Sequence, residues 1–292
     1  MVLLLFRTPR SFLPPDTARC RSLQADKRCI TKITNTAPPL SQQRKITAIL
    51  STWDEAIQTA IQLLKAKQER KRGLMQQLLS GKKRLPGFSE EWYEVKSGEI
   101  FKNISIKNHP NEELLSATQD RGVIPRSMLE GRVAMPESET KAYKLVKKGN
   151  FLISLRSFQG GIEYSEYQGI VSPAYTVLTS RLTIDEGFYK HYFKSGRFIR
   201  KLGVAIIGIR DGKQISFDDF SVIKIPQPVF QEQCAIAAVL NAADDEIRLA
   251  KVEVDALKQQ KRGLMQELLT GKTMVKVEEE EHQSDLLKST LV

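Results

Sequence analysis

Cysteine is scarce in this chain of 292 residues, and its three thiols show no paired spacing; they are Cys20, Cys29 and Cys234. This pattern argues against a disulfide framework and a zinc site, and it is typical of a reducing compartment. We therefore expect a cytoplasmic protein. Long apolar runs are also missing, and none approaches the ~18 residues that a membrane-spanning helix requires. The sequence predicts no membrane association.

Fingerprints of catalysis and cofactor binding are largely missing as well. No glycine-rich dinucleotide fingerprint follows an expected strand, and no Asn-Pro-Pro-aromatic motif of a methyltransferase is present. The segment 203–208 has the glycine spacing of a phosphate loop, but Ile209 and Arg210 follow where Lys and Ser or Thr are required. The three histidines stand alone rather than in a ligand cluster; they are His109, His191 and His282. We expect no cofactor, no metal and no catalysis by this chain.

One enzymatic alternative remains open. Glu94-Val95-Lys96 has the Glu-x-Lys form with which metal-dependent nucleases hold magnesium and polarise water. That chemistry also needs an acidic ligand upstream, and no Asp lies between Asp54 and Asp120. A magnesium-dependent nuclease that uses Glu94 and Lys96 is therefore the alternative that a cleavage assay would test.

Positive charge is what the chain has in excess. The formal net charge is +11 and the isoelectric point is near 9.5. An acidic partner is expected, and nucleic acid is the commonest one. Long solvated helices also carry lysine, so a scaffold that binds protein rather than DNA is the second alternative.

A long segment occurs twice in the chain. Residues 38–82 align without a gap to residues 228–272, at a constant offset of 190, and 19 of the 45 aligned positions are identical. The match is strongest in the last twelve residues, 71–82 and 261–272. A solenoid repeat would recur every ~20–50 residues, whereas this one recurs once at a domain-sized distance. The sequence predicts one helix, an inserted domain, and the same helix again.

Both copies have the apolar spacing of an amphipathic helix. Each follows proline and ends in Ser-Gly or Thr-Gly, which suits a helix start and a left-handed residue past a helix end. Such a helix spans on the order of 55 Å, too long to be stable alone, so we expect the two to pair antiparallel. The stripe positions are Ile46, Ile49, Leu50, Trp53, Ile57, Ile61 and Leu64, and Ile236, Val239, Leu240, Ala243, Ile247, Ala250, Val254 and Leu257.

These segments carry a family resemblance. Pro-Pro-Leu-Ser-Gln-Gln-Arg-Lys-Ile over 38–46 and Lys-Arg-Gly-Leu-Met-Gln-Gln-Leu-Leu-Ser-Gly-Lys over 71–82 resemble the conserved region of type I restriction–modification specificity subunits, HsdS. The second copy resembles it too, and Leu85-Pro86-Gly87-Phe88 resembles the start of the family's target recognition domain. The resemblance covers about residues 38–272. The family alternates two recognition domains with two helices, whereas one recognition domain is seen here, so we expect a half-length form.

The expected fold is α+β, with one globular target recognition domain between two long helices that form an antiparallel coiled-coil stalk. We expect a disordered leader over 1–37, the first helix over 38–82, the domain over 83–227, the second helix over 228–272 and a disordered acidic tail over 273–292. Within the domain, strands are expected at 151–155, 170–171 and 175–178, and one helix over 188–202.

Two polar, glycine-flanked loops are the expected base readers. Arginine and lysine can bond guanine O6 and N7 in the major groove, and glutamine can bond adenine N6 and N7. The first loop supplies Arg156, Ser157 and Gln159, and the second supplies Arg210, Lys213 and Gln214. Surface ion pairs at turns are the other interpretation of these residues. Further candidates for DNA contact are Arg121, Arg126, Tyr164 and Tyr167.

The resemblance also implies partners. It implies double-stranded DNA, of which the domain reads one half of a split site, and modification subunits that carry S-adenosylmethionine and the adenine methylation chemistry. A restriction subunit that uses ATP can join. Unmatched apolar stripes favour a homodimer or pairing with another half-subunit. The helix residues expected to bind partners are Trp53, Ile57, Leu74, Met75, Leu264 and Met265.

Overall fold

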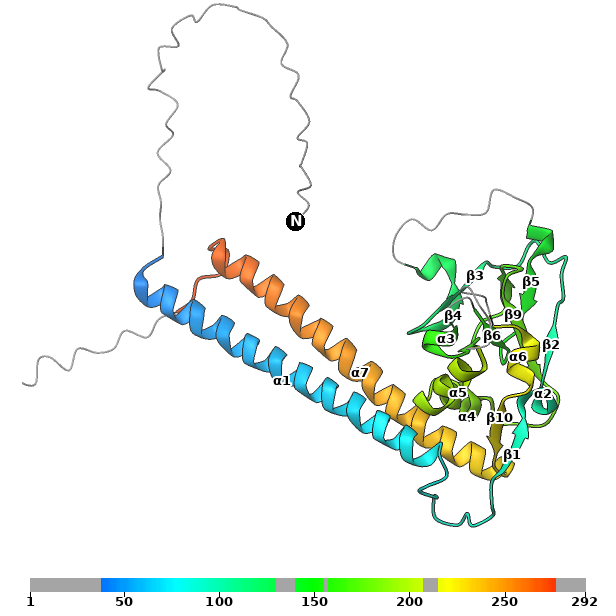
Figure 1. Ribbon diagram of the computed structural model, residues 1–292. Helices are drawn as coiled ribbons and strands as arrows, with labels where there is room; N and C mark the ends of the chain where they lie inside the picture. The colour runs from blue at the N-terminus through cyan, green and yellow to red at the C-terminus, as the bar shows by residue number, and fades with distance from the viewer. Residues whose placement is uncertain (1–37, 130–139, 155–156, 207–214, 277–292) are drawn as a thin grey trace, which may run out of the picture. The chain divides into compact units, whose positions relative to one another are not determined.

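The computed structural model of the chain describes residues 38–129, 140–154, 157–206 and 215–276 (Figure 1). Contacts divide the chain into two compact units, of which the larger, Ile46–Met274, holds almost every described element. The smaller unit is formed by Met1–Lys45 and Val275–Val292. The expected leader over 1–37 and the acidic tail beyond residue 276 lie outside the described residues. Within the described ranges, no helix has the length and apolar composition needed to cross a membrane.

The two copies of the repeat form the long helices α1 (Leu40–Leu78) and α7 (Phe230–Leu269). Each is a few residues shorter than its sequence segment. Gly81 and Gly271 follow the helix ends with φ of 71° and 72°, the left-handed conformation that favours glycine. The backbone N–H of Lys272 donates to the carbonyl of Glu267 at 3.1 Å, so a bond that reaches back over Gly271 closes the last turn.

The helices α1 and α7 run side by side in opposite directions (Figure 1). Asp54 of α1 pairs with Lys261 of α7 at 2.5 Å, and Lys67 pairs with Glu246 at 2.8 Å. Numbers rise along one helix as they fall along the other, which is the signature of antiparallel pairing. Further along, Arg70 donates to the same Glu246 at 2.7 Å. These bridges are partly exposed, so each contributes little to stability, but together they fix the register.

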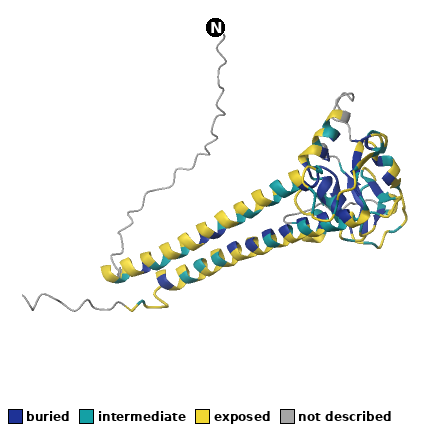
Figure 2. Cartoon of the chain, turned by 90° about the horizontal axis from the view of Figure 1, so that it is seen from below, coloured by how far each residue is buried: buried dark blue, intermediate teal, exposed yellow. Residues whose placement is uncertain are grey.

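The expected apolar stripes become buried to different extents (Figure 2). On α7 the stripe is largely covered, and its buried members are Ile236, Leu240, Ala243, Ile247, Ala250 and Val254. On α1, Ile46 and Ile57 are buried, whereas the rest of the stripe is half-buried: Ile49, Leu50, Trp53, Ile61 and Leu64. The remaining faces of both helices are mostly exposed. The apolar stripe of α7 is therefore covered along most of its length, whereas the stripe of α1 is partly exposed.

Short strands and helices alternate between α1 and α7, so the middle of the chain is α+β as expected. The strands are β1 (Tyr93–Lys96), β2 (Phe101–Ile104), β3 (Leu115–Thr118), β4 (Gly122–Pro125), β5 (Lys144–Val146), β6 (Phe151–Ile153), β7 (Glu163–Tyr164), β8 (Gly169–Val171), β9 (Thr176–Ser180) and β10 (Lys224–Gln227). The helices are α2 (Ser97–Ile100), η1 (Arg126–Met128), η2 (Thr140–Ala142), α3 (Ser157–Gly160), α4 (Glu186–Tyr192), α5 (Gly196–Ile206) and α6 (Phe217–Ser221). Strands β6, β8 and β9 lie within or next to the segments predicted as strand.

Among the described strands, four form an antiparallel sheet in the order β2-β9-β6-β7. The other described pairs are β1 with β10, β3 with β4 and β5 with β8, all antiparallel. The pairing of β1 with β10 joins the first strand of the middle domain to its last strand. Because α1 precedes β1 and α7 follows β10, this pair brings the two long helices to the same end of the domain.

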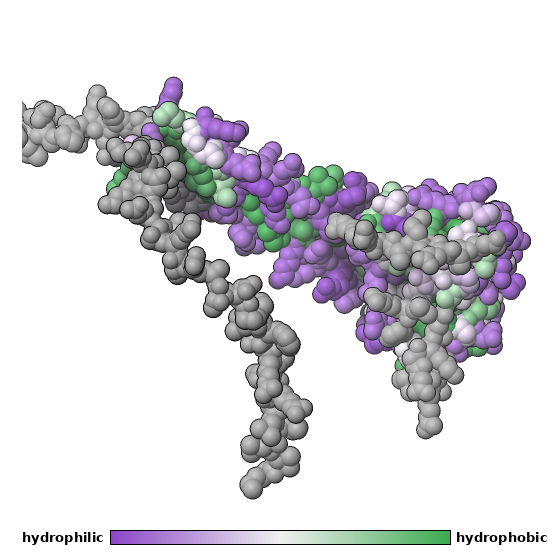
Figure 3. Space-filling model, turned by 90° about the horizontal axis from the view of Figure 1, so that it is seen from above, coloured by the Kyte–Doolittle hydropathy of each residue, from purple (hydrophilic) through white to green (hydrophobic). Residues whose placement is uncertain are grey.

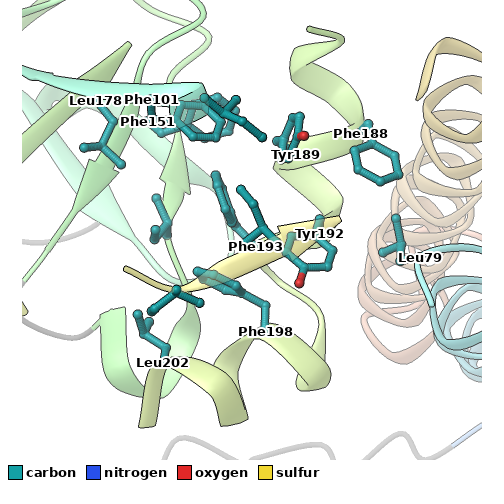
Figure 4. Packing of buried hydrophobic residues seen from close by; sticks show 14 of the residues in the cluster. Leu79, Phe101, Phe151, Leu178, Phe188, Tyr189, Tyr192, Phe193, Phe198 and Leu202 are labelled. Atoms are coloured by element: carbon teal, nitrogen blue, oxygen red, sulfur yellow. The ribbon is translucent and has the colours of Figure 1, made fainter. Parts of the chain in front are cut away.

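An aromatic core packs between the four-stranded sheet and helices α4 and α5 (Figure 4). Phe101 and Phe151 point from the sheet toward Tyr189 and Phe193 of α4, with ring centroids 5.3–5.8 Å apart. Such edge-on and tilted contacts add to the apolar area that each ring buries. Leu79, just past α1, belongs to the same core. The long helices are therefore packed into the domain rather than tethered to it.

The single helix predicted over 188–202 is wrong, because the chain breaks between α4 and α5. Ser195 causes the break: its Oγ donates to the Tyr192 carbonyl at 2.6 Å and accepts the Phe198 N–H at 3.3 Å. A serine in this position caps the start of the following helix. The break was not predicted from the sequence because Tyr192 and Phe198 continue a helix-like apolar spacing across it. Residues 203–206 also belong to α5, which ends at Ile206.

Candidate nucleic-acid interface

A buried carboxylate joins the middle domain to α7. Glu232, in the first turn of α7, is fully buried and accepts two hydrogen bonds from Arg84, at 2.6 Å from Nε and 2.7 Å from Nη2. Trp92 Nε1 donates to the same carboxylate at 2.8 Å. The hydrogen bond to Glu232 raises the pKa of Arg84, so the guanidinium stays charged. This bidentate contact fixes the start of the domain on the start of α7.

The neighbouring Gln233 adds a second fixed contact. Its amide Nε2 donates to the Pro228 carbonyl at 2.8 Å, and its Oε1 accepts the Asp185 N–H at 2.9 Å. Asp185 in turn caps α4 by accepting the Phe188 N–H at 2.8 Å. The first turn of α7 therefore orients α4, and with it the aromatic core.

Lys194 ties together the turn segments that carry polar side chains. Its Nζ donates to the Gly160 carbonyl at 3.0 Å, to the Gln119 carbonyl at 3.3 Å and to Glu163 Oε1 at 2.5 Å. Gly160 ends α3, and Gln119 lies in the turn between β3 and β4. One ammonium thus holds α3, the β3–β4 turn and β7 at fixed positions, as a preorganised reading surface needs.

Glu163 is buried beneath this junction. Burial raises its pKa, and the charge of Lys194 opposes that shift. Its Oε2 has no hydrogen-bond partner among the described residues. A buried, half-satisfied carboxylate is costly unless its cation stays in place. Glu163 therefore supports the junction and does not itself reach a ligand.

Four of the predicted DNA-contacting residues, Arg156, Arg210, Lys213 and Gln214, lie outside the described residues. Of the other two loop residues, Gln159 is exposed on α3 and free to reach a ligand. Ser157 is buried, and its Oγ accepts the Ser154 N–H at 2.8 Å, so it closes the turn that begins α3.

The β3–β4 hairpin and β7 place the remaining candidates. Arg121 is exposed in the β3–β4 turn and donates to the Met128 carbonyl at 3.3 Å. Gly122 beside it has φ of 70°, and a Cβ there would lie 2.8 Å from the Tyr164 carbonyl, so only glycine allows this approach. Arg126 is half-buried and donates to Ser116 Oγ at 3.2 Å. The structure therefore places Arg121 next to β7 and holds Arg126 against β3.

The two tyrosines have structural partners. Tyr164 donates to Glu186 at 2.9 Å, and Lys190 lies over its ring at 5.4 Å. Burial and the Glu186 carboxylate both raise the pKa of Tyr164, so its hydroxyl is a hydrogen-bond donor at neutral pH. Tyr167 is half-buried against the cluster that includes Leu115 and Val123. Gln159, Arg121 and Tyr164 lie on adjoining segments, whereas Tyr167 contributes mainly to packing.

The helix residues predicted to bind partners fall into two groups. Leu74 and Met75 pack against the domain's own core, so this chain already covers them in part. Ile57 is buried, Trp53 and Leu264 are half-buried, and Met265 is exposed. The two copies of the motif thus differ in what they leave for a partner.

The nuclease alternative finds no support in the geometry. Glu94 accepts hydrogen bonds from Arg197 at 3.0 Å and from Lys201 at 2.9 Å, which neutralise the carboxylate that would have to hold a metal. Across the described ranges, no group of three His, Cys, Asp or Glu side chains is arranged to hold a metal ion. Glu94 instead anchors the basic helix α5 to β1.

The sequence reasoning missed the basic side of α5. Arg197, Arg200 and Lys201 recur at helical spacing on α5, and Lys194 lies just before the helix. This spacing was readable from the sequence once the helix start at Gly196 was known. A DNA-facing role for these cations was not predicted because the apolar residues dominated the interpretation of 188–202.

An α+β domain mounted on two repeated helices, with polar side chains on its turns and a basic helix beside them, defines a recognition module. Residues 89–259 match the family described as "Type I restriction modification DNA specificity domain". The match covers more than half of the chain, and the chain belongs to this family. The resemblance carried by the two copies of the repeat is confirmed.

Curated relatives cover most of the chain. One is provisionally named the type I restriction enzyme MjaX specificity subunit of Methanocaldococcus jannaschii; it is 28% identical over an alignment of 257 residues, and the match covers 82% of this chain and 59% of that protein. The type I restriction enzyme MjaVIII specificity subunit of the same organism is 27% identical and covers 91% of this chain and 68% of its own length. The chain thus spans about three fifths of the MjaX relative.

A solved structure has the same fold. The crystal structure of the type I restriction–modification system S subunit from M. genitalium aligns with a TM-score of 0.51 and 19% identity, covering 78% of this chain and 61% of that one. At this identity the likeness describes the fold, in which a recognition domain and long helices occur together.

Proposed function

We propose that this chain is the specificity subunit of a type I restriction–modification complex. It binds double-stranded DNA and reads one half of a bipartite site through the domain over 83–227. It carries no catalysis of its own. Modification subunits supply S-adenosylmethionine and adenine methylation, and a restriction subunit that uses ATP joins the complex.

The observation that carries the proposal is the junction at Lys194. It holds exposed Gln159 and the turn that bears Arg121 beside each other on rigid elements. Glutamine pairs with adenine and arginine with guanine in the major groove. The net charge of +11 supplies the general attraction to phosphate. Arg156, Arg210, Lys213 and Gln214 are proposed to extend the same surface.

The helices are proposed to form an antiparallel coiled-coil stalk that docks the modification subunits. The cross-helix ion pairs and the covered stripe of α7 support this. Apolar side chains also interrupt the polar surface of the helices (Figure 3). Those that remain exposed on the helices include Leu63, Leu249, Val252 and Leu269. Exposed apolar residues on charged helices are typical of an interface that another helix completes.

We further propose that two chains associate. Two copies related by a two-fold axis would place identical recognition domains at opposite ends of a joint stalk. The DNA site would then be an interrupted palindrome, because the symmetry of a dimer is mirrored in its site. A second half-subunit with a different recognition domain would give an asymmetric split site. Light scattering on the purified chain, alone and with modification subunits, separates a dimer from a monomer.

The experiment that tests DNA binding is a titration of random-sequence duplex against salt. With on the order of five phosphate contacts, log K should fall with log salt at a slope of about −4 to −5. A slope near zero favours the protein-binding scaffold. Cleavage of DNA by the purified chain with magnesium would instead favour the nuclease.

A test of base reading uses Gln159→Ala. Loss of one bidentate base contact relaxes discrimination at one position by ~1–3 kcal/mol with little change in overall affinity. Selection from a random duplex pool measures this as a degenerate position in the enriched motif. Arg156→Ala and Arg210→Ala test the two glycine-flanked loops in the same way. The matched control is Gln58→Ala, an exposed glutamine on α1. An unchanged motif in all three loop variants would show that other residues read the bases.

A further inference from the structure

We propose that a basic groove between the end of α1 and the start of α5 holds the phosphodiester backbone of the bound DNA. This inference rests on the proposed function and adds a site to it. The groove encloses about 970 Å³. Its α1 side is built from the last residues of the first motif copy, and its other side from α5. The lining residues used below are Lys71, Arg72, Lys82, Lys194, Arg197 and Arg200.

Among the described residues no carboxylate lines the groove, and three of these six cations have no ion-pair partner. Arg72, Lys82 and Arg200 are exposed and form no ion pair with any described residue. The other three have partners that lie outside the groove lining: Lys71 with Asp244, Lys194 with Glu163, and Arg197 with Glu94. Three positive charges that line the same groove repel each other, and an anion bound in the groove would offset this repulsion.

The groove is also shaped for close approach of a backbone. The eleven-residue helix α5 begins at Gly196 on its wall, and the N-terminal end of a helix favours negative charge. A Cβ added at Gly196 would meet just one side chain within 4 Å, Arg200 at 3.7 Å. Half-buried Met75 also lines the groove and offers apolar surface against which sugar carbons can pack. A lining of cations and apolar carbon suits a sugar–phosphate chain.

Lys194 connects this groove to the proposed base-reading segments. It lines the groove, and its Nζ bonds the carbonyls of Gly160 and Gln119. The segments that carry Gln159 and Arg121 therefore lie beside the groove. Because the groove adjoins the proposed base-reading segments, DNA bound to those segments would also reach the groove. An acidic protein segment would gain nothing from this neighbourhood, so DNA is the favoured occupant.

The internal repeat supplies a matched control. Arg262 and Lys272 occupy the places in the second motif copy that Arg72 and Lys82 occupy in the first, and both are exposed. Replacing either pair by glutamine removes the same charge from the same local sequence. Only the first pair lines the groove. A difference between the two double variants therefore reports the groove and not the overall charge.

The experiment compares full-length wild type, Arg72→Gln/Lys82→Gln and Arg262→Gln/Lys272→Gln in salt titrations with a random-sequence duplex pool. Circular dichroism confirms that each variant is folded. We expect the groove variant to bind at least tenfold more weakly at ~0.1 M salt, with a slope shallower by about 2, since each phosphate contact contributes about 0.9. The enriched sequence should stay that of the wild type, because phosphate contacts position the protein without reading bases. Arg200→Gln should reduce the slope by about 1.

The outcomes separate this site from the proposed function. If wild type binds with a steep slope and the groove variant keeps wild-type affinity and slope, the groove inference is overturned while DNA recognition stands. Equal losses in both double variants also overturn it, because the effect is then general charge. If the groove variant binds DNA normally but fails to assemble with modification subunits, the occupant is a protein. If wild type shows no salt-dependent binding, the proposed function and the groove both fail.

Discussion

Leu79 and Leu269 occupy the same place in two nearly identical twelve-residue segments, yet Leu79 is 2% exposed and Leu269 is 65% exposed. The segments over 71–82 and 261–272 differ only at Gln77 and Glu267 and at Ser80 and Thr270. The first ends against the aromatic core of the domain, whereas Leu269 is no member of that core. The same residues thus build a domain junction in one copy and leave a partly open helix surface in the other.

The starts of the two copies differ in the opposite sense. In the first turn of α7, Glu232 and Gln233 are buried, and Arg84 and Trp92 hold Glu232. In α1 the equivalent Gln42 is half-buried. Yet Gln43 Nε2 bonds the Pro38 carbonyl at 2.8 Å, as Gln233 Nε2 bonds the Pro228 carbonyl at 2.8 Å. Local sequence therefore sets the helix start, while burial depends on what packs against it.

The largest expected difference between the copies is at their ends. Leu79→Ala removes a side chain from the core and should lower the free energy of unfolding by about 3–5 kcal/mol. Leu269→Ala removes an exposed side chain and should change it by less than ~0.5 kcal/mol. Urea denaturation of both variants measures the difference. Equal effects would contradict the account of the two ends.

The next largest difference in stability is expected from the first turns of the two helices. Glu232→Gln gives α7 the residue that α1 has, and it leaves the half-buried Arg84 without its charge partner. We expect a loss of about 2–3 kcal/mol, near the lower end for breaking a buried pair because Arg84 is partly exposed. The reciprocal change, Gln42→Glu, should alter unfolding by less than ~0.5 kcal/mol. A stable Glu232→Gln variant would show that the junction does not depend on this pair.

The pH dependence of stability tests the packing of α4 against α7. His191 is buried, bonds Asn241 at 2.9 Å, and lies near Lys71 and Asp244. Burial lowers its pKa to about 4, with Lys71 and Lys190 adding to the shift, and Asn241 and Asp244 opposing it. The unfolded chain then takes up a proton near pH 6.5, before the folded one does, so stability falls as pH drops from about 6.5 toward 4.

The expected loss is about 2 kcal/mol between pH 7.5 and pH 5. Denaturation at several pH values measures it. His191→Gln should flatten this part of the profile, whereas His109→Gln, at a less buried position, should leave it as in wild type. A wild-type profile that is flat over this range would contradict a buried neutral His191.

The smallest effect concerns the middle of the helix pair. Trp53 is half-buried on α1, whereas its equivalent on α7, Ala243, is buried. Trp53→Ala should cost about 1–2 kcal/mol, less than the ~3–5 expected for a fully buried ring. Thermal unfolding of the helices measures it, with Trp53→Phe as a control that keeps an aromatic ring at this position. A cost above 4 kcal/mol would show that a partner chain covers Trp53.

Much of the fold was predictable because both copies of the repeat carry the same pattern of a long amphipathic helix. The helix ends at Gly81 and Gly271, the apolar stripes and the α+β middle domain follow from local periodicity and turn chemistry. The break at Ser195 did not follow, because Tyr192, Phe193 and Phe198 all reach one core across it. The contacts of Glu232 with Arg84 were not predictable either, since they join positions far apart in the sequence.

The candidate site was predictable only in part. Gln159 and Arg121 stood out as polar residues beside glycine, and the structure places them on adjoining segments. Lys194, which joins those segments, had no local signal, because its role depends on the carbonyls of Gly160 and Gln119. The basic groove was missed for the same reason: Arg72 and Arg200 are brought together only by the fold.

The measurement that tests the central claim most directly is the sequencing of methylated adenines in a host that contains the modification subunits, with and without this gene. If this chain reads DNA, a bipartite methylated motif appears only when the gene is present, and it is an interrupted palindrome if two identical chains associate. The Gln159→Ala variant should shift or relax that motif. An identical methylation pattern with and without the gene would contradict the assignment of this chain as a working specificity subunit.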